Sequence, residues 1–174
     1  MWGDLKVSIP NPYDCQSPLF IMFDTVHLFK CIRNNWFNEK MQCLLFPSFN
    51  NFQERKLAQL NTIKTLYMSE SNSLVKLAPS LNQKVLFPSS FERQNVKLVT
   101  GLFNEKVVAA LTLLHPSEDG LIEFLNIINK WWNIVNVKTF LKGQTRHLPE
   151  AEPIKAVDSN NLVFLEKFVD WLQC

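Results

Sequence analysis

The sequence predicts a mainly α-helical protein that begins with a short strand–helix unit. Two observations lead to this fold class. Beyond residue 50, apolar residues recur three and four positions apart, which is the spacing of one face of an α-helix. Only residues 19–23 form a short, wholly apolar run of the kind typical of a strand buried on both faces. With 174 residues, 47% of them hydrophobic, the chain is long enough for one good-sized domain or for one domain and part of another.

The first elements run from the N-terminus to residue 37. Residues 1–17 are rich in proline and poor in helix formers, so we expect an extended segment. Residues 19–23 then form the predicted buried strand, which ends at Asp24. Over residues 25–37, helical spacing places one group of residues on an apolar side and another on a polar side. The apolar side holds Val26, Phe29, Ile32 and Trp36, and the polar side holds His27, Lys30 and Asn34.

The remaining elements are all predicted to be helices. Amphipathic helices are expected over residues 52–69, 91–114, 119–135 and 160–172, with a shorter one at residues 72–82. Asp119 is the expected N-cap of the third of these, and Asn160 or Asn161 that of the last.

Two polar stretches separate these units. Residues 142–159, which include a glycine and two prolines, are expected to form a loop. A boundary within residues 38–50 divides the chain into one unit of residues 1–40 and a helical one of residues 41–174.

Charge and cysteine content exclude several classes of protein. A net charge of +2 is too small to predict nucleic-acid binding by itself. The four cysteines lie at wide, unequal spacings without a nearby histidine cluster, which indicates free thiols rather than a zinc site. The sequence has no signal peptide and no apolar run of the roughly 20 residues that a membrane span needs. We therefore expect a soluble protein of the nucleus or cytoplasm, with no membrane partner.

Asp24 is the strongest candidate for a catalytic residue. A carboxylate at the carboxyl end of a buried strand lies where α/β sheets usually place reactive groups. The alternative is that Asp24 only caps the following helix by accepting from the amide of Val26 or His27, which stabilises by about 1 kcal/mol. The residues alone leave both interpretations open.

The segment after this strand resembles P-element-type DNA transposases, which are related to the THAP-domain transposases. The resemblance is carried by Asp24, His27, Leu28, Lys30, Arg33, Asn34 and Asn35, while Thr25 stands where the family usually has proline. It implies that residues 1–40 belong to a catalytic domain with the RNase H-like fold. It also implies that Asp24 is one of three carboxylates holding two Mg²⁺ or Mn²⁺ ions, with the other two outside this sequence.

The two basic residues behind Asp24 are candidates for contact with DNA. Lys30 and Arg33 are predicted to face DNA phosphate, because such contacts need only positioned cations. The alternative is a solvated helix face, since lysine and arginine are mostly exposed in any fold.

The helical part resembles the GTP-binding insertion of the same family over residues 88–110 and 124–138. This resemblance implies a nucleotide pocket made by Asn95, Val96, Asn104, Trp132, Asn133 and Asn136. The family has Lys, Ser and Asp where this chain has Asn95, Asn104 and Asn133. Because an amide offers one acceptor where a carboxylate offers two, GTP binding is expected to be weakened. For Trp132 and its neighbour Trp131, the alternative is plain core packing.

Two functional hypotheses follow. The first is a fragment of a P-element-like transposase, whose full-length relatives cut and join DNA, with transposon ends and GTP as partners and no catalysis by this chain alone. The alternative is a non-catalytic, domesticated module that binds nucleotide, DNA or protein. The first predicts a nuclear protein, whereas a relic of a transposase is compatible with the cytoplasm. Homo-oligomerisation is left open by both.

Overall fold

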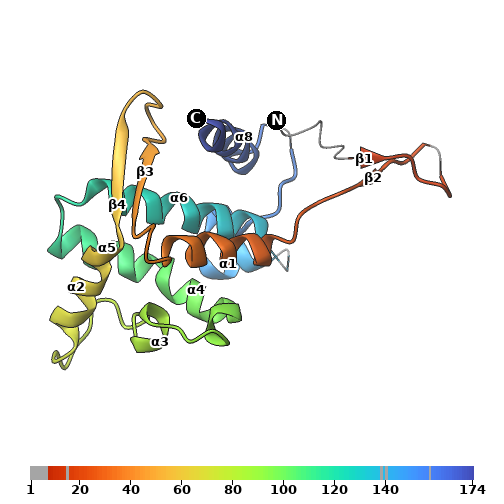
Figure 1. Cartoon of the computed structure of the whole chain (residues 1–174). Helices are drawn as coiled ribbons and strands as arrows, with labels where there is room; N and C mark the ends of the chain where they lie inside the picture. Colours follow the sequence, from red (N-terminus) through yellow and green to blue (C-terminus); the bar gives the residue numbers. More distant parts are fainter. Residues whose placement is uncertain (1–7, 15, 138, 140, 157) are drawn as a thin grey trace.

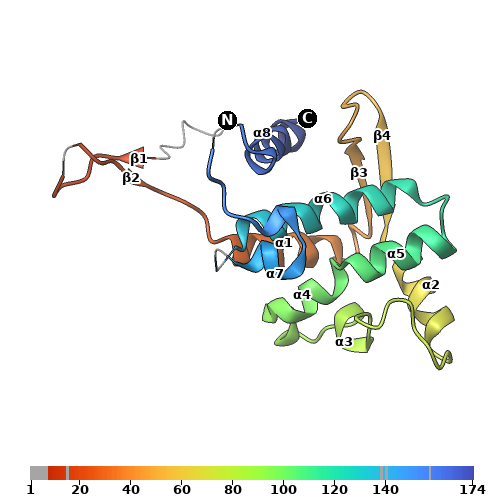
Figure 2. The same ribbon diagram turned by 180° about the vertical axis from the view of Figure 1, so that it is seen from behind.

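The fold is a helical body built around one long central helix. The computed structural model describes residues 8–14, 16–137, 139, 141–156 and 158–174. Helix α6 (Asp119–Val135) runs through the middle of this body, with α1 (Thr25–Trp36) alongside it (Figure 1). Seen from behind, α5 (Glu105–Leu114) lies beside α6, and α4 (Val96–Leu102) lies below α5 (Figure 2). The mainly α-helical prediction is confirmed.

The N-terminal strands stand apart from the helical body. Strands β1 (Ser8–Ile9) and β2 (Leu19–Phe20) pair antiparallel and project away from the helices (Figure 1). The predicted buried strand is wrong, because the side chains of residues 19–23 are exposed, Phe20 by 73% and Met22 by 80%. Within the described residues, β2 pairs only with β1, so no wider sheet covers this apolar run.

Helix α1 begins and ends close to its predicted limits. Its apolar side packs into the core, where the Phe29 ring stacks on Trp132 with centroids 4.1 Å apart. Trp36 meets Phe124 of α6 edge-on at 5.1 Å. The predicted apolar face of this helix is confirmed, and it anchors α1 to α6 through aromatic pairs.

A second strand pair follows α1. Strands β3 (Cys43–Pro47) and β4 (Arg55–Gln59) are antiparallel, with Leu45 opposite Leu57. The predicted helix over residues 52–69 is therefore wrong in its first part, and α2 spans only Leu60–Glu70. Leu57 lies three positions before Leu60, so the helical spacing continues by coincidence across a strand–helix junction.

The next region contains four short elements in place of two predicted helices. These are α3 (Gln83–Leu86), the 3₁₀ turn η1 (Glu92–Gln94), α4 and α5. No helix covers residues 72–82, and the helix predicted over residues 91–114 is divided. The division follows from two asparagines: Asn95 and Asn104 accept from the amides of Lys97 and Lys106, at 3.0 Å each. Each asparagine thereby starts a new helix.

The C-terminal elements are α6, α7 (Lys142–Arg146), the 3₁₀ turn η2 (Pro149–Ala151) and α8 (Asn160–Gln173). The predicted loop over residues 142–159 thus contains two short helical turns. The capping predictions are wrong, because the N-caps of α6 and α8 are Glu118 and Ser159, one residue before Asp119 and Asn160. The buried Asn161 instead donates to carbonyl oxygens of η2 and the residue after it.

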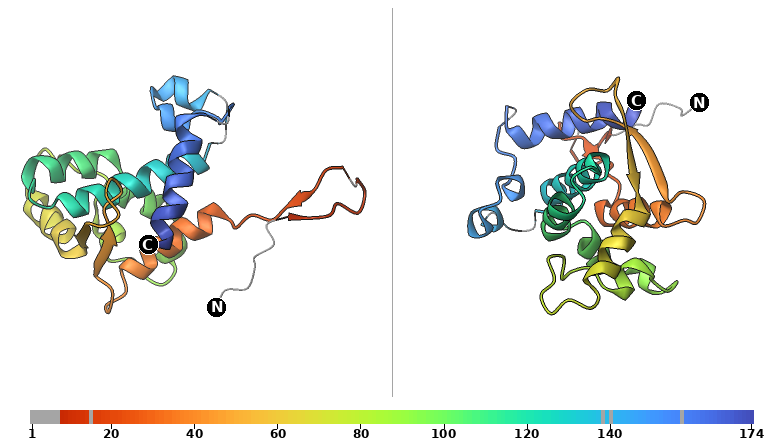
Figure 3. Two further views of the ribbon diagram at one scale, coloured as in Figure 1. Left: turned by 90° about the horizontal axis from the view of Figure 1, so that it is seen from above. Right: turned by 90° about the vertical axis from the view of Figure 1, so that its left-hand side faces the viewer.

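Helix α8 closes the core from the far side. It crosses over α6 (Figure 3), where Phe168 stacks on Trp131 with centroids 5.9 Å apart. The indole Nε1 of Trp171 donates to the Pro47 carbonyl of β3 at 2.5 Å. Helices α1, α6 and α8 share one aromatic core, so residues from both predicted units pack together. The boundary between residues 1–40 and 41–174 stays a prediction.

The described cysteines Cys31, Cys43 and Cys174 are free thiols, as predicted, and Cys15 lies outside the described residues. No helix in the described part of the chain combines the length and apolarity that a membrane span requires.

Candidate functional site

A cavity lies between the end of α6 and the start of α5. Its volume is about 730 Å³, within the range of roughly 300–1,000 Å³ that is typical of small-molecule sites. The wall consists mainly of amide and aromatic side chains, and among the described residues Glu105 contributes a carboxylate and Lys106 an ammonium group.

Four of the six residues predicted to bind nucleotide line this one cavity. Asn104 contributes as the N-cap of α5. Trp132 and Asn133 come from the last turn of α6, and Asn136 is the residue at which that helix ends. Residues three and four positions apart are neighbours on a helix surface, so Asn136 lies next to both Asn133 and Trp132.

The other two predicted residues lie elsewhere. Asn95 caps α4 at the end remote from Asn104, and Val96 packs against the core. Neither lines the cavity. Asn129 and Thr100 do line it and were missed by the sequence analysis, although Asn129 lies one helical turn before Asn133.

Trp132 has two roles in this arrangement. It is 93% buried and stacks on Phe29 at an interplanar angle of 10°, as expected for core packing. It also forms part of the cavity wall, next to Phe103. Trp131 has only the packing role, because it faces α8 and does not line the cavity.

The cavity suits a planar, hydrogen-bonding ligand better than a highly charged one. Asn129 and Asn133 can both donate and accept, which matches the mixed edges of a heterocycle. Lys106 and the positive end of the α5 dipole attract an anion, while Glu105 opposes it.

Asp24 serves as a helix cap. Its Oδ1 accepts from the Val26 amide at 2.9 Å, and the residue is exposed. Among the described residues, no group of three or more His, Cys, Asp or Glu side chains is placed to hold a metal ion. The described carboxylates therefore do not fit a two-metal site by themselves.

The two predicted DNA contacts differ in their surroundings. Lys30 is half-buried and donates through Nζ to Gln94 Oε1 at 3.3 Å. Arg33 is 0% exposed and donates through Nη2 to the Arg93 carbonyl at 2.9 Å. Burial, and secondarily the charge of Arg93, lower the pKa of Arg33. A guanidinium buried in this way offers no surface to a DNA phosphate, so the expectation for Arg33 does not fit this structure.

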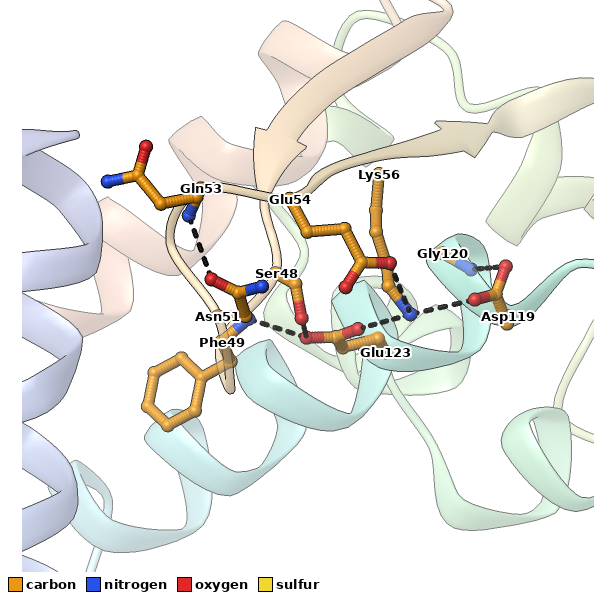
Figure 4. Close-up of polar contacts among 9 residues, drawn as sticks. All are labelled: Ser48, Phe49, Asn51, Gln53, Glu54, Lys56, Asp119, Gly120 and Glu123. Carbon is orange, nitrogen blue, oxygen red and sulfur yellow. Dashed lines mark hydrogen bonds and ion pairs between the residues drawn. The ribbon is translucent and has the colours of Figure 1, made fainter.

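A polar network on the opposite part of α6 was also missed (Figure 4). Lys56 Nζ lies 2.7 Å from Asp119 and 3.1 Å from Glu123, and Glu123 also accepts from the Ser48 hydroxyl and the Phe49 amide. Hydrogen bonds to Asp119 and then Glu123 raise the pKa of Lys56. The network ties the β3–β4 hairpin to α6.

Comparison with known proteins finds one similarity in sequence and one in structure. No family model matches the sequence. The sequence is 24% identical over 149 residues to the transposable element P transposase of Drosophila melanogaster, covering 79% of this chain and 18% of that protein. The structure resembles a chain of the Drosophila P element transposase strand transfer complex, with a TM-score of 0.64 and 18% identity. The chain is a relative of the P-element transposases.

The similarity covers most of this chain but only part of each relative. The likeness to the solved P-element transposase covers 97% of this chain and 43% of that chain. This chain therefore spans less than half of the solved relative and about a fifth of the curated one. The family resemblance expected from the Asp24 segment is confirmed, and the P-element transposase fold is shared along nearly the whole chain.

Proposed function

We propose that this chain contributes to a P-element-type transposase and that the cavity between α5 and α6 is its nucleotide pocket, with GTP as the ligand. The convergence of Asn104, Trp132, Asn133 and Asn136 on one cavity supports this proposal. Under it, the complete protein acts on transposon DNA in the nucleus, and its similarity to a transposable element P transposase and to a P element transposase strand transfer complex supports the action on transposon DNA.

Under this proposal, different residues of the cavity contact the base and the phosphates of the nucleotide. Trp132 and Phe103 provide apolar surface for a base, and the amides of Asn129 and Asn133 pair with its polar edge. Within the described part of the chain, Lys106 is the cation of this cavity that can contact phosphate. Binding of GTP is expected to be weak, because the charge of Lys106 is balanced by Glu105 and an amide accepts only one of two donated guanine hydrogens.

Titration calorimetry with GTP, and with ATP alongside, tests this assignment. We expect a Kd above about 100 µM for GTP. In Asn133→Asp, a charged acceptor replaces a neutral one, a difference of about 1.4 kcal/mol, so GTP should bind about tenfold more tightly while ATP should not. Asn61→Asp is the matched control, because it adds the same charge at an exposed position of α2, outside this cavity.

Two results would contradict the proposal in different ways. Absence of nucleotide binding by both the natural chain and Asn133→Asp would remove the nucleotide assignment. Micromolar binding of GTP that Asn136→Ala abolishes would keep the pocket but show that the asparagine substitutions do not weaken it.

Asp24 and Lys30 carry the DNA-directed part of the proposal. Asp24 would act as an Mg²⁺ or Mn²⁺ ligand only together with carboxylates that the described residues do not bring to it. Lys30 remains the candidate phosphate contact. This chain by itself should therefore show no metal-dependent nicking of DNA, and robust nicking that Asp24→Ala abolishes would overturn this view.

A further inference from the structure

A second cavity lies on another side of α6 and differs in character from the first. Its volume is about 550 Å³, it is open to solvent, and its lining residues come from α6, α8, the end of α5 and the loop after β3. The two cavities have no lining residue in common. Its wall is largely apolar, with Ile122, Ile127 and Pro116, and carries the amides of Asn50 and Asn126.

Two lysines of this cavity are positioned over aromatic rings. Lys130 of α6 places Nζ 4.8 Å from the ring centroid of Phe164, and Lys167 of α8 places Nζ 4.8 Å from that of Phe49. The two rings pack against each other with centroids 5.1 Å apart. The paired rings thus bring both ammonium groups to one side of the molecule and restrict their motion.

Neither lysine has a carboxylate partner within the described part of the chain. The ion pairs found there involve Lys56 and Lys84. The two carboxylates that line the cavity, Asp119 and Glu123, are engaged by Lys56, and Glu123 also accepts from Ser48 and Phe49 (Figure 4). The ammonium groups of Lys130 and Lys167 are therefore available to bind an anion from outside the chain.

We propose that this cavity binds single-stranded nucleic acid, with Lys130 and Lys167 contacting phosphates and the apolar wall receiving a base. Charge complementarity favours a polyanion, and the apolar wall with its two amides favours a base over a simple carboxylate. A single strand fits because its bases are free to enter a cavity, whereas those of a duplex are stacked and paired. The inference deepens the proposed function by adding a nucleic-acid surface, and it does not depend on the GTP pocket.

Fluorescence anisotropy with a labelled ten-nucleotide single-stranded DNA tests the proposal. One phosphate contact to a single strand changes the slope of log affinity against log salt by about 0.7, which corresponds to about fivefold in affinity at 0.1 M salt. Lys130→Gln and Lys167→Gln should each show this loss, and the double variant about twice the change in slope. Lys130→Arg and Lys167→Arg should retain binding.

Lys64→Gln is the matched control, because Lys64 also lies over a phenylalanine ring, at 5.9 Å from Phe87, but outside this cavity. It should bind the oligonucleotide as the natural chain does. The proposal is overturned if the natural chain does not bind the oligonucleotide, or if Lys64→Gln weakens binding as much as the cavity variants. Equal or tighter binding of a duplex, or of a deca-glutamate peptide, would also overturn it. The change in GTP binding on Asn133→Asp reports on the other cavity, so either proposal can fail without the other.

Discussion

Replacement of Gly120 by alanine tests the packing of α6 against β4. Gly120 is the second residue of α6, and a Cβ added there would lie 2.4 Å from the carbonyl oxygen and 2.9 Å from the amide nitrogen of Leu57. Both atoms belong to the backbone of β4, so no side-chain rotation relieves the contact. The helix and the strand would have to separate by roughly 0.6 Å to reach the 3.0 Å below which real Cβ contacts essentially never lie.

The expected magnitude follows from two opposing effects. Helix propensity favours alanine over glycine by up to about 1 kcal/mol. Overpacking against a fixed backbone costs about 3 kcal/mol, and the displacement also disturbs the ion pair between Lys56 and Asp119. The net expectation is a loss of about 2 kcal/mol in the free energy of unfolding, or a fall in Tm of roughly 4–8 °C for a chain of this length.

Urea unfolding followed by far-UV circular dichroism measures this change. Asn126→Ala, at an exposed position of the same helix, is the control and should be neutral or slightly stabilising. If Gly120→Ala is as stable as the natural chain, then a Cβ at position 120 does not clash with the backbone of β4, and the expected destabilisation by overpacking is refuted.

Three further predictions concern single side chains. Asp24→Ala should lower the free energy of unfolding by about 1 kcal/mol, whereas Asp24→Asn should leave it nearly unchanged because asparagine also caps helices; equal effects in urea unfolding would argue against the cap. Arg33→Met should keep or increase thermal stability, because it removes a buried guanidinium whose Nε and Nη1 have no partner. A loss above about 1 kcal/mol would show instead that the bond from Arg33 to its carbonyl partner is net stabilising. Lys56→Met should cost about 1 kcal/mol near pH 7. Lys56 lowers the pKa of Asp119, so this stabilisation is present above about pH 4 and should be lost as the pH falls further. Urea unfolding of Lys56→Met and of the natural chain at pH 7 and pH 3 measures this. If the two chains differ in free energy of unfolding as much at pH 3 as at pH 7, the ion pair with Asp119 is not the cause.

Local patterns in the sequence predicted what depends on near neighbours. Helical spacing after Asp24 was sufficient to find α1 and its apolar side, because the residues concerned lie within a few turns. The grouping of Trp132, Asn133 and Asn136 was expected from the family resemblance, and the three residues lie within about one helical turn of each other.

Features that depend on distant residues were not predictable in this way. Arg33 is buried because η1, sixty residues further on, supplies a carbonyl and closes over it. Strand β4 exists because β3 pairs with it, and its own spacing favoured a helix. The family resemblance placed Asn95 and Asn104 in one pocket, whereas each asparagine caps its own helix.

The projecting pair of β1 and β2 has a consequence for the behaviour of this chain in solution. Within the described part of the chain, no further strand pairs with its outer edges, which lie next to the exposed apolar residues 19–23. Such an edge is a template for pairing with another chain. Concentrated samples should therefore self-associate through this hairpin, and a shortened chain beginning at Asp24 should be the better subject for crystallisation and for the binding measurements described above.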